Sequence, residues 1–247
     1  MSEGVLVVNK PQGPTSHDVV AIVRRRLGLR RIGHTGTLDP MAEGVLVLLI
    51  GRATRRQQAL QTHAKRYETV IRLGTQTDTG DAWGRVIRRA PVATLSRHTV
   101  EDVLASLVGR HQQVPPPFSA VKIRGRPLYW WTRRGVSVAA APRPIEIFSA
   151  ELMDLSTEPR EPEPGGLVWR LRCGIMCSSG TYIRSLAEEI AARLGTVGHV
   201  EWLRRQAVGP WTIEQAKELE WIKSAGVEAL WQAVQPLEEP HAHVART

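Results

Sequence analysis

Two segments with the composition of long strands, residues 145–155 and 167–177, are separated only by the polar segment 156–166. The separating segment is rich in Pro, Glu and Gly, which suit turns and interrupt regular structure. Because strand signals flank it on both sides, we expect a solvated hairpin connection and not a domain linker. A hairpin with strands of this length commits much of the chain to an antiparallel sheet.

The rest of the chain alternates between strand signals and helix signals without a regular repeat. Thr15 or Ser16 is placed to cap a helix that ends at Gly28, and Thr99 with Asp102 approximates the capping box of a second helix. An irregular mixture of this kind favours the α+β class, with a mixed, mostly antiparallel central sheet flanked by helices and loops. Further strands are predicted at 4–8, 45–50 and 67–73, further helices at 127–134 and from 178 to 193, and residues 118–122 are expected to pair with a sheet edge.

Arginine dominates the charge of this 247-residue chain. There are 33 Lys and Arg residues against 24 Asp and Glu, a net charge of +9, and 28 of the 33 basic residues are Arg. Arg is always charged, binds phosphate groups with two hydrogen bonds and stacks on bases, so the excess indicates a nucleic-acid partner. A biased genome composition or a thermophilic habit produces the same excess, and charge alone does not separate these interpretations.

Several classes of cofactor and location have no signal in the sequence. The chain has neither a GxGxxG nor a Walker pattern, and Cys173 and Cys177 form an isolated C-x3-C pair, which is a poor zinc signature. We therefore expect no cofactor, no metal and two buried free thiols. There is no charged-then-apolar leader and no apolar run long enough to span a bilayer, so we expect a cytoplasmic protein without membrane contact.

The segment from Gly33 to Pro40, Gly-His-Thr-Gly-Thr-Leu-Asp-Pro, is the strongest candidate for chemistry. Its glycines permit backbone conformations that other residues avoid, and a strand signal at 45–50 follows, so Asp39 is expected to be held in position. Asp39 is either a carboxylate nucleophile or base, or a structural residue that forms an Asx turn or caps a helix. A catalytic Asp39 needs a cationic or hydrogen-bonding partner to stay ionised. For His34, stacking on bases is the functional alternative to a local hydrogen bond.

Six blocks of this sequence can be compared with known families: residues 9–13, 33–46, 65–79, 113–129, 177–184 and 199–205. They resemble the TruB-type tRNA pseudouridine-55 synthases and follow one another in the order of that family. Together they extend over residues 4–237. One departure is Phe118, where the family usually has Tyr, so a hydroxyl is either not needed there or is supplied elsewhere. The matching blocks are the Lys-Pro motif (9–13), the catalytic motif (33–46), the second core motif (65–79), the central segment (113–129) and the C-terminal core motifs (177–184 and 199–205).

The resemblance implies the pseudouridine synthase fold, with an active-site cleft across the sheet, and isomerisation of uridine 55 in the T-arm loop of tRNA without a cofactor. In this reaction the C1′–N1 bond breaks, the base rotates, and C5 is joined to C1′. By the same resemblance, Asp39 is the nucleophile, attacking C1′ or base C6, Arg184 pairs with Asp39, and Tyr67 stacks on the uracil and removes the C5 proton. The implied substrate-binding residues are Tyr182 and Leu203 in the pocket, His34 in the space that the flipped base leaves, Lys10 below the site, and Gly36 and Thr37 in the catalytic motif.

The resemblance also bears on domain organisation. Bacterial members commonly carry a C-terminal PUA RNA-binding domain, and the residues after Pro236 are too few for one. We therefore expect a catalytic domain at 1–237, a flexible tail at 238–247, no PUA domain, and a monomer that binds the T-arm stem-loop of tRNA. From charge, and not from the resemblance, we predict an RNA phosphate patch formed by Arg24, Arg25, Arg30, Arg31, Lys122 and Arg124.

Two other functions are compatible with parts of the sequence. One is a non-catalytic tRNA-binding or RNA-chaperone protein in which Asp39 is a turn residue. A pure binder has no need of Asp39, Tyr67 and Arg184 together, which disfavours that function. The other is a pseudouridine synthase guided by a separate RNA, which the expected lack of a PUA domain disfavours.

Overall fold

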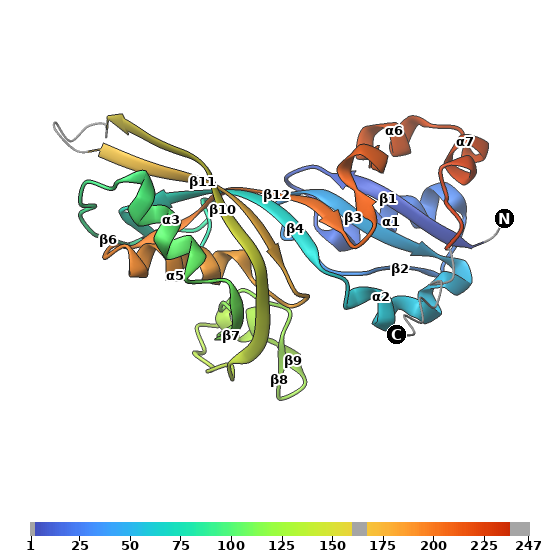
Figure 1. Ribbon diagram of the computed structural model, residues 1–247. Helices are drawn as coiled ribbons and strands as arrows, with labels where there is room; N and C mark the ends of the chain where they lie inside the picture. The colour runs from blue at the N-terminus through green and yellow to red at the C-terminus, as the bar shows by residue number, and fades with distance from the viewer. Residues whose placement is uncertain (1–2, 160–166, 238–247) are drawn as a thin grey trace, which may run out of the picture. The chain divides into compact units, whose positions relative to one another are not determined.

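The chain forms two compact units in a computed structural model that describes residues 3–159 and 167–237 (Figure 1). Unit 1 consists of residues 1–62 and 210–247, and unit 2 of residues 63–209. The two ends of unit 2 lie side by side, because the Gly209 amide donates to the Ala64 carbonyl at 2.9 Å. The tail predicted at 238–247 lies outside the described residues, and a catalytic domain spanning 1–237 stays a prediction.

The sheet of unit 1 is built around two buried strands, β1 (Gly4–Lys10) and β3 (Glu43–Ile50), which pair antiparallel along their length. β2 (Ile32–His34) pairs antiparallel with β3, and β14 (Lys217–Glu218) pairs parallel with β1. The strands predicted at 4–8 and 45–50 are thereby confirmed and are slightly longer than predicted. Their uninterrupted apolar runs fit strands that are buried on both faces.

Helix α1 (Ser16–Leu27) supplies most of the helical side of the unit 1 core. Thr15 is its N-cap, in a capping box with Asp18, and Gly28 ends it in the left-handed conformation at φ 65°, as the sequence predicts. Its valines pack with Leu6 of β1, Leu48 of β3 and apolar residues of the C-terminal helices. The other elements of unit 1 are short: η1 (Gly51–Arg56), α2 (Gln57–Gln61), β13 (Trp211–Thr212), η2 (Ile213–Gln215), α6 (Leu219–Ser224) and α7 (Val227–Gln232).

The sheet of unit 2 has the strand order β12-β4-β11-β10-β7, with every neighbouring pair antiparallel. The predicted hairpin is confirmed as β10 and β11, but β10 continues four residues beyond the predicted strand, to Pro159. Ser156–Glu158 were therefore wrongly assigned to the connection, because their polar side chains hid residues that pair with Arg170, Trp169 and Val168. The five strands are β4 (Lys65–Leu73), β7 (Gly109–Gln113), β10 (Arg143–Pro159), β11 (Leu167–Cys177) and β12 (Gly198–Val208).

Helices α3 (Arg97–Ala105) and α5 (Ile183–Arg193) pack on this sheet, α3 on β10 and α5 on β12, and also contact each other (Figure 1). The capping box predicted at Thr99 and Asp102 is wrong: the N-cap is Ser96, whose hydroxyl accepts from the Thr99 amide, and Asp102 lies one turn into the helix. The helix predicted at 127–134 is confirmed as α4 (Leu128–Thr132).

Two small hairpins complete unit 2: β5 (Thr75–Thr77) with β6 (Val86–Arg89), and β8 (Lys122–Ile123) with β9 (Arg126–Pro127). The prediction that residues 118–122 pair with a sheet edge is wrong. Only Lys122 of that segment is in a strand, and its partner is Pro127 across a tight turn. Both hairpins stand outside the main sheet of the unit.

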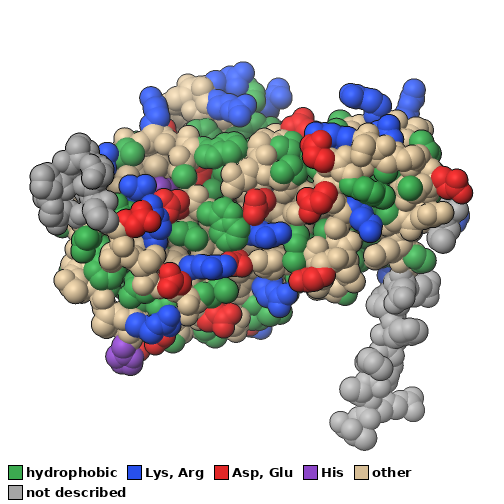
Figure 2. Space-filling view, turned by 90° about the horizontal axis from the view of Figure 1, so that it is seen from above, with side chains coloured by type: hydrophobic (Ala, Val, Ile, Leu, Met, Phe, Trp, Pro, Cys, Tyr) green, Lys and Arg blue, Asp and Glu red, His purple; other side chains and the backbone are tan. Residues whose placement is uncertain are grey.

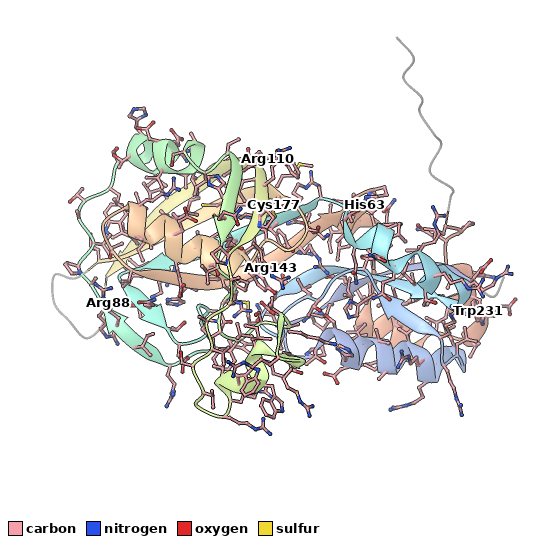
Figure 3. All side chains as sticks on the ribbon, turned by 90° about the horizontal axis from the view of Figure 1, so that it is seen from below. His63, Arg88, Arg110, Arg143, Cys177 and Trp231 are labelled. Carbon is pink, nitrogen blue, oxygen red and sulfur yellow. The ribbon has the colours of Figure 1, made fainter. Side chains whose placement is uncertain are left out.

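Both cysteines lie on β11 in the sheet of unit 2. Cys173 and Cys177 are buried free thiols, as predicted, and Figure 3 shows Cys177 within the molecule. Burial raises the pKa of Cys173 to about 12 and that of Cys177 to about 11, so both thiols stay protonated and unreactive near neutral pH.

On the face of the molecule shown in Figure 2, positively and negatively charged side chains are mostly interspersed. In Figure 2, Lys and Arg side chains alternate with Asp and Glu over the visible face. Arg170 of β11 bridges Glu201 of β12 and Glu158 of β10, and Arg172 pairs with Glu68 of β4. Such mixing neutralises the field of the neighbouring charges. Within residues 3–159 and 167–237, no helix is long and apolar enough to cross a membrane.

Candidate active site

The loop that carries Asp39 is fixed to the rest of unit 1 on both sides of the carboxylate. Ser16, at the start of α1, is buried and bonds the Leu38 peptide twice: its hydroxyl donates to the Leu38 carbonyl at 3.0 Å and accepts from the Leu38 amide at 2.9 Å. On the other side, the Gly13 amide donates to the Pro40 carbonyl at 2.9 Å. Asp39 itself is half-buried between these anchors.

Asp39 does not cap a helix. A turn at Pro40–Met41 leads directly into β3, with the Ala42 amide donating to the Asp39 carbonyl at 3.1 Å. The helix-cap alternative for Asp39 is therefore wrong. Met41 and Ala42 are buried, so the turn is packed onto the unit and not free in solvent.

Lys10 lies at the end of β1 and is fully buried. Its ammonium donates to the carbonyls of Pro11 at 2.8 Å, Pro14 at 3.0 Å and Pro40 at 3.5 Å. These bonds connect the Lys-Pro motif to the residue after Asp39, which fits the predicted role of Lys10 below the site. A buried ammonium requires such partners, because unpaired burial of a charge is very costly.

His34 closes the other end of the loop. Its Nδ1 accepts from the Gly36 amide at 3.2 Å, so the ring proton of the neutral imidazole lies on Nε2. The ring lies edge-on to His17, with centroids 5.6 Å apart. The Thr35 amide donates to the Val47 carbonyl of β3 at 3.1 Å, while Thr37 is exposed. The local hydrogen bond, one of the two alternatives for His34, is thus present, and Thr37, three residues further along, is exposed.

Tyr67 and Leu203 lie on one face of the unit 2 sheet. Tyr67 of β4 is opposite Arg205 of β12, and Leu203 is opposite Thr69, so Tyr67 and Leu203 are diagonal neighbours. Both side chains are buried. The structure therefore brings together these two residues, which come from sequence blocks far apart in the chain.

Arg184 is 3% exposed in the first turn of α5 and is fixed by two loops of unit 2. Its guanidinium donates to the Thr79 carbonyl at 2.8 Å and to the Phe118 carbonyl at 2.9 Å. Its Nε lies 3.9 Å from a carboxylate oxygen of Asp81. Phe118 contributes its backbone, which explains why no side-chain hydroxyl is needed for this contact. The alternative that Arg184 points into water is wrong.

Asp81 is a residue of this site that the sequence argument did not single out. It is buried, and its second carboxylate oxygen accepts from the Thr79 hydroxyl at 2.7 Å and the Trp83 amide at 3.0 Å. Its position two residues after Thr79 of the second core motif was the available signal. The predicted pair between Arg184 of unit 2 and Asp39 of unit 1 stays a prediction.

Tyr182 is the N-cap residue of α5. Its backbone amide and carbonyl both bond the side chain of Gln113, at the end of β7. The Gln113 side chain accepts from the Tyr182 amide at 2.8 Å and donates to the Tyr182 carbonyl at 3.1 Å. One turn further, the Ser185 hydroxyl donates to the Val114 carbonyl at 3.0 Å. The central segment thus supports the C-terminal core motif directly.

Residues 24–183 match the family model described as TruB family pseudouridylate synthase, N-terminal domain. The chain belongs to this family. It is 46% identical over 220 residues to a protein named tRNA pseudouridine synthase B from Thermobifida fusca, covering 89% of this chain and 74% of that protein. It is 41% identical over 246 residues to one from Geobacillus thermodenitrificans, covering 99% of this chain and 80% of that protein. The resemblance inferred from the sequence blocks is confirmed, and the chain is an enzyme of the pseudouridine-forming isomerase class.

Solved structures of lower identity share the fold. A crystal structure of an archaeal box H/ACA sRNP Nop10-Cbf5 complex contains a chain that is 26% identical, with a TM-score of 0.65 over 95% of this chain and 60% of that one. A Cbf5-Nop10-Gar1 complex is similar at 29% identity and a TM-score of 0.64, again covering 95% of this chain and 60% of the other. The α+β pseudouridine synthase fold is thereby confirmed.

The predicted phosphate patch falls on both units. Arg24, Arg25, Arg30 and Arg31 are exposed at the C-terminal end of α1 and beyond it, with Arg24 also donating to the Ile32 carbonyl and Arg31 to the Thr54 hydroxyl. In unit 2, Lys122 and Arg124 are exposed on the β8–β9 hairpin. Beside them the sequence argument missed Trp130, which has Arg134 over its ring at 3.6 Å and Arg126 at 5.4 Å.

The described residues provide no evident metal site. Within residues 3–159 and 167–237, no group of three or more His, Cys, Asp or Glu side chains is arranged to hold a metal ion. The ionisable groups found near the candidate residues are instead held by backbone carbonyls and by each other, as at Lys10 and Arg184.

Proposed function

We propose that this TruB-family chain isomerises uridine 55, in the T-arm loop of tRNA, to pseudouridine without a cofactor. The observation that carries the proposal is the anchoring of the Asp39 loop, where Ser16, Gly13 and Lys10 hold the backbone on both sides of a half-buried carboxylate. A turn residue without a function does not need a buried lysine and a buried serine to fix it. The curated relatives at 46% and 41% identity carry the name tRNA pseudouridine synthase B, which supports tRNA as the substrate.

In this proposal Asp39 attacks C1′ or base C6, and the glycosidic C1′–N1 bond breaks. The uracil, freed from the sugar, rotates, and C5 bonds to C1′. The bond from Asp39 to C1′ or C6 breaks and restores the carboxylate, and Tyr67 removes the proton from C5 while N1 regains one. Arg184 pairs with Asp39 and keeps it ionised. Tyr67 and Leu203, diagonal neighbours on the sheet, together with Tyr182, hold the uracil during its rotation.

The target base is extruded from the folded loop before reaction, which costs a few kcal/mol of lost stacking. His34 fills the vacated space, and Gly36 and Thr37 contact the RNA backbone beside it. The Gly36 amide orients the His34 ring, which supports a rigid insertion of the imidazole. Lys10 supports the site from below through its carbonyl contacts.

The T-arm stem is bound through phosphate contacts by a monomer of this chain, with no metal ion and no membrane. Arg24, Arg25, Arg30 and Arg31 of unit 1, with Lys122 and Arg124 of unit 2, are exposed and positively charged, as phosphate contacts require. The cation–π contacts at Trp130 support the assignment of the β8–β9 region to RNA binding.

Asp39→Asn tests the proposed chemistry. With unmodified tRNA transcript tritiated at uridine C5, we expect the variant to release no tritium while its affinity for the transcript stays within about threefold of wild type. Normal tritium release by Asp39→Asn would overturn the nucleophile assignment. Wild-type protein that binds the transcript and forms no pseudouridine would instead support the RNA-chaperone alternative.

The RNA-guided alternative rests on the fold shared with the Cbf5 structures, which are only 26–29% identical to this chain. Mapping pseudouridine in a bare tRNA transcript after incubation with the protein alone separates the RNA-guided alternative from the proposal that the protein acts without a guide. We expect modification at position 55 only. A requirement for an added guide RNA would contradict the proposal.

A further inference from the structure

The β5–β6 hairpin of unit 2 presents an unusually exposed set of side chains. All four residues of β6, Val86 to Arg89, are exposed. Trp83, in the turn between the strands, is 57% exposed, and Ile87 is 60% exposed. A large indole left in solvent beside arginines needs an explanation beyond packing.

The turn that carries Trp83 is rigid. The Trp83 amide donates to the buried Asp81 carboxylate at 3.0 Å, and the Arg85 amide donates to Asp78 at 2.8 Å. At Gly84 a Cβ would lie 2.3 Å from the Thr79 hydroxyl oxygen and 2.7 Å from the Asp78 carboxylate, so only glycine fits there. The backbone that carries the indole is therefore ordered before any partner arrives, which lowers the entropy cost of binding.

The exposed charge of the hairpin is positive. Its two acidic residues are engaged: Asp78 pairs with Arg85 at 3.2 Å, and Asp81 is buried. Arg88 and Arg89 extend the positive charge along β6, opposite Gln76 and Thr75 (Figure 3 labels Arg88). Charged residues on a strand edge also prevent aggregation, but that role does not require an exposed tryptophan.

The turn of the hairpin, between β5 and β6, contacts Arg184. Asp81 accepts from the Trp83 amide through one carboxylate oxygen, and its other oxygen lies 3.9 Å from Arg184 Nε. The same turn gives Arg184 the Thr79 carbonyl as a second partner. A nucleotide that stacks on Trp83 would thus contact the loop that positions a proposed catalytic residue.

We propose that the β5–β6 hairpin is an RNA-binding arm, in which Trp83 stacks on an unpaired base of the substrate and Arg88 and Arg89 contact its phosphates. The inference rests on the proposed function, because it takes the substrate to be RNA. An aromatic face beside arginines is the combination that binds single-stranded nucleic acid, and the exposed cations favour a polyanion over a protein surface.

The Kd for an unmodified tRNA transcript tests the arm, because this measurement does not depend on catalysis. For Trp83→Ala we expect the Kd to rise about five- to one-hundred-fold, and Trp83→Phe to restore most of the affinity. For Arg88→Glu/Arg89→Glu we expect at least a tenfold rise and a salt slope shallower by about two. At saturating tRNA the rate of pseudouridine formation should stay within about threefold of wild type.

Two controls match these variants in unit 1. Trp221→Ala removes another exposed tryptophan, and Lys217→Glu/Lys223→Glu changes the net charge equally. Both should bind the transcript within about twofold of wild type. Trp83→Ala and Arg88→Glu/Arg89→Glu proteins that fold normally by circular dichroism and bind like wild type would overturn the arm. A wild-type protein that binds tRNA without modifying it would overturn only the proposed function.

Discussion

Arg184 is a buried cation whose planar guanidinium serves two backbone carbonyls at once, those of Thr79 and Phe118. Lysine carries the same charge but not the fork of donors, so Arg184→Lys should leave at least one carbonyl without its partner. We expect the free energy of unfolding to fall by about 2 kcal/mol and pseudouridine formation to fall at least tenfold. Urea unfolding and tritium release measure these quantities.

Arg193→Lys is the matched control, since Arg193 lies at the other end of α5 and makes partly exposed bonds to Glu189 and Ser106. Its unfolding free energy should change by less than about 1 kcal/mol. An equal loss of unfolding free energy in Arg184→Lys and Arg193→Lys would mean that the two buried carbonyl bonds of Arg184 do not stabilise the protein more than the partly exposed bonds of Arg193 do.

The buried Lys65 makes the free energy of unfolding depend on pH. Lys65 is 6% exposed, and its ammonium donates to the His63 carbonyl at 2.6 Å. Burial, with the nearby charge of Arg205, lowers the pKa of Lys65 to about 8 from an ordinary value of 10.5. Between these two values the unfolded chain binds more protons at Lys65 than the folded chain does. The contribution of Lys65 to the free energy of unfolding therefore rises with pH in this window.

Comparison of wild type with Lys65→Met tests the combined effect of Lys65 and its coupling to Cys177, because titration of the buried Cys173 is common to both proteins. We expect the unfolding free energy of wild type, relative to Lys65→Met, to increase between pH 7.5 and 9.5. Urea unfolding at several pH values measures the difference. A difference that is constant or decreases across this window would show that Lys65 keeps an ordinary pKa.

At the scale of elements, Gln113 joins β7 to the start of α5 by two hydrogen bonds to the backbone of one residue, the amide and the carbonyl of Tyr182. Gln113→Leu keeps the size of the side chain and removes both bonds, so it should cost about 1–3 kcal/mol of stability and raise KM for tRNA. Gln112→Leu, at an exposed neighbour on the same strand, is the control. If both variants unfold at the same urea concentration as wild type, the clamp does not stabilise the helix start.

The elements that sequence patterns predicted best are those with one apolar face or a clean cap. The runs of β1 and β3 and the Thr15 and Gly28 caps of α1 gave strong local signals. Strand β12 was missed because it carries Glu201, Arg204 and Arg205, although Arg205 is buried. Burial of such a charge depends on neighbouring strands, so no local pattern reveals it.

The site shows the same division. Motifs singled out Asp39, Tyr67 and Arg184, and the resemblance placed Lys10 below the site, but the sequence did not indicate that Ser16 fixes the Asp39 loop or that Asp81 accompanies Arg184. The Ser16 and Lys10 contacts use backbone carbonyls or amides, which any residue carries, and the Asp81–Arg184 contact joins side chains about a hundred positions apart in the sequence. Side-chain motifs therefore nominate candidate site residues more readily than they reveal the contacts that hold those residues in place.

For the whole molecule, RNA affinity should depend steeply on salt, because exposed cations of the phosphate patch occur on both units. Each phosphate contact releases counterions and adds about 0.9 to the slope of log K against log salt. Arg30→Ala/Arg31→Ala and Lys122→Ala/Arg124→Ala should each make this slope shallower by about one to two. Binding isotherms with tRNA transcript at several salt concentrations give the slopes.

The exposed Lys223, away from the patch in sequence, provides the control for this series. Lys223→Ala should leave the slope unchanged. A shallow slope in wild type, or an equal change in all variants, would contradict phosphate binding by these residues.

The hydrogen bond between Gly209 and Ala64 has a consequence for how such a chain can be assembled and altered. Unit 2 begins and ends at neighbouring points, so 147 consecutive residues, from 63 to 209, form a closed excursion from a chain whose two flanking parts make unit 1. Proteins tolerate the insertion and replacement of segments whose ends meet in this way. Exchange of the whole excursion between relatives would therefore need to preserve the meeting of its two ends at Ala64 and Gly209.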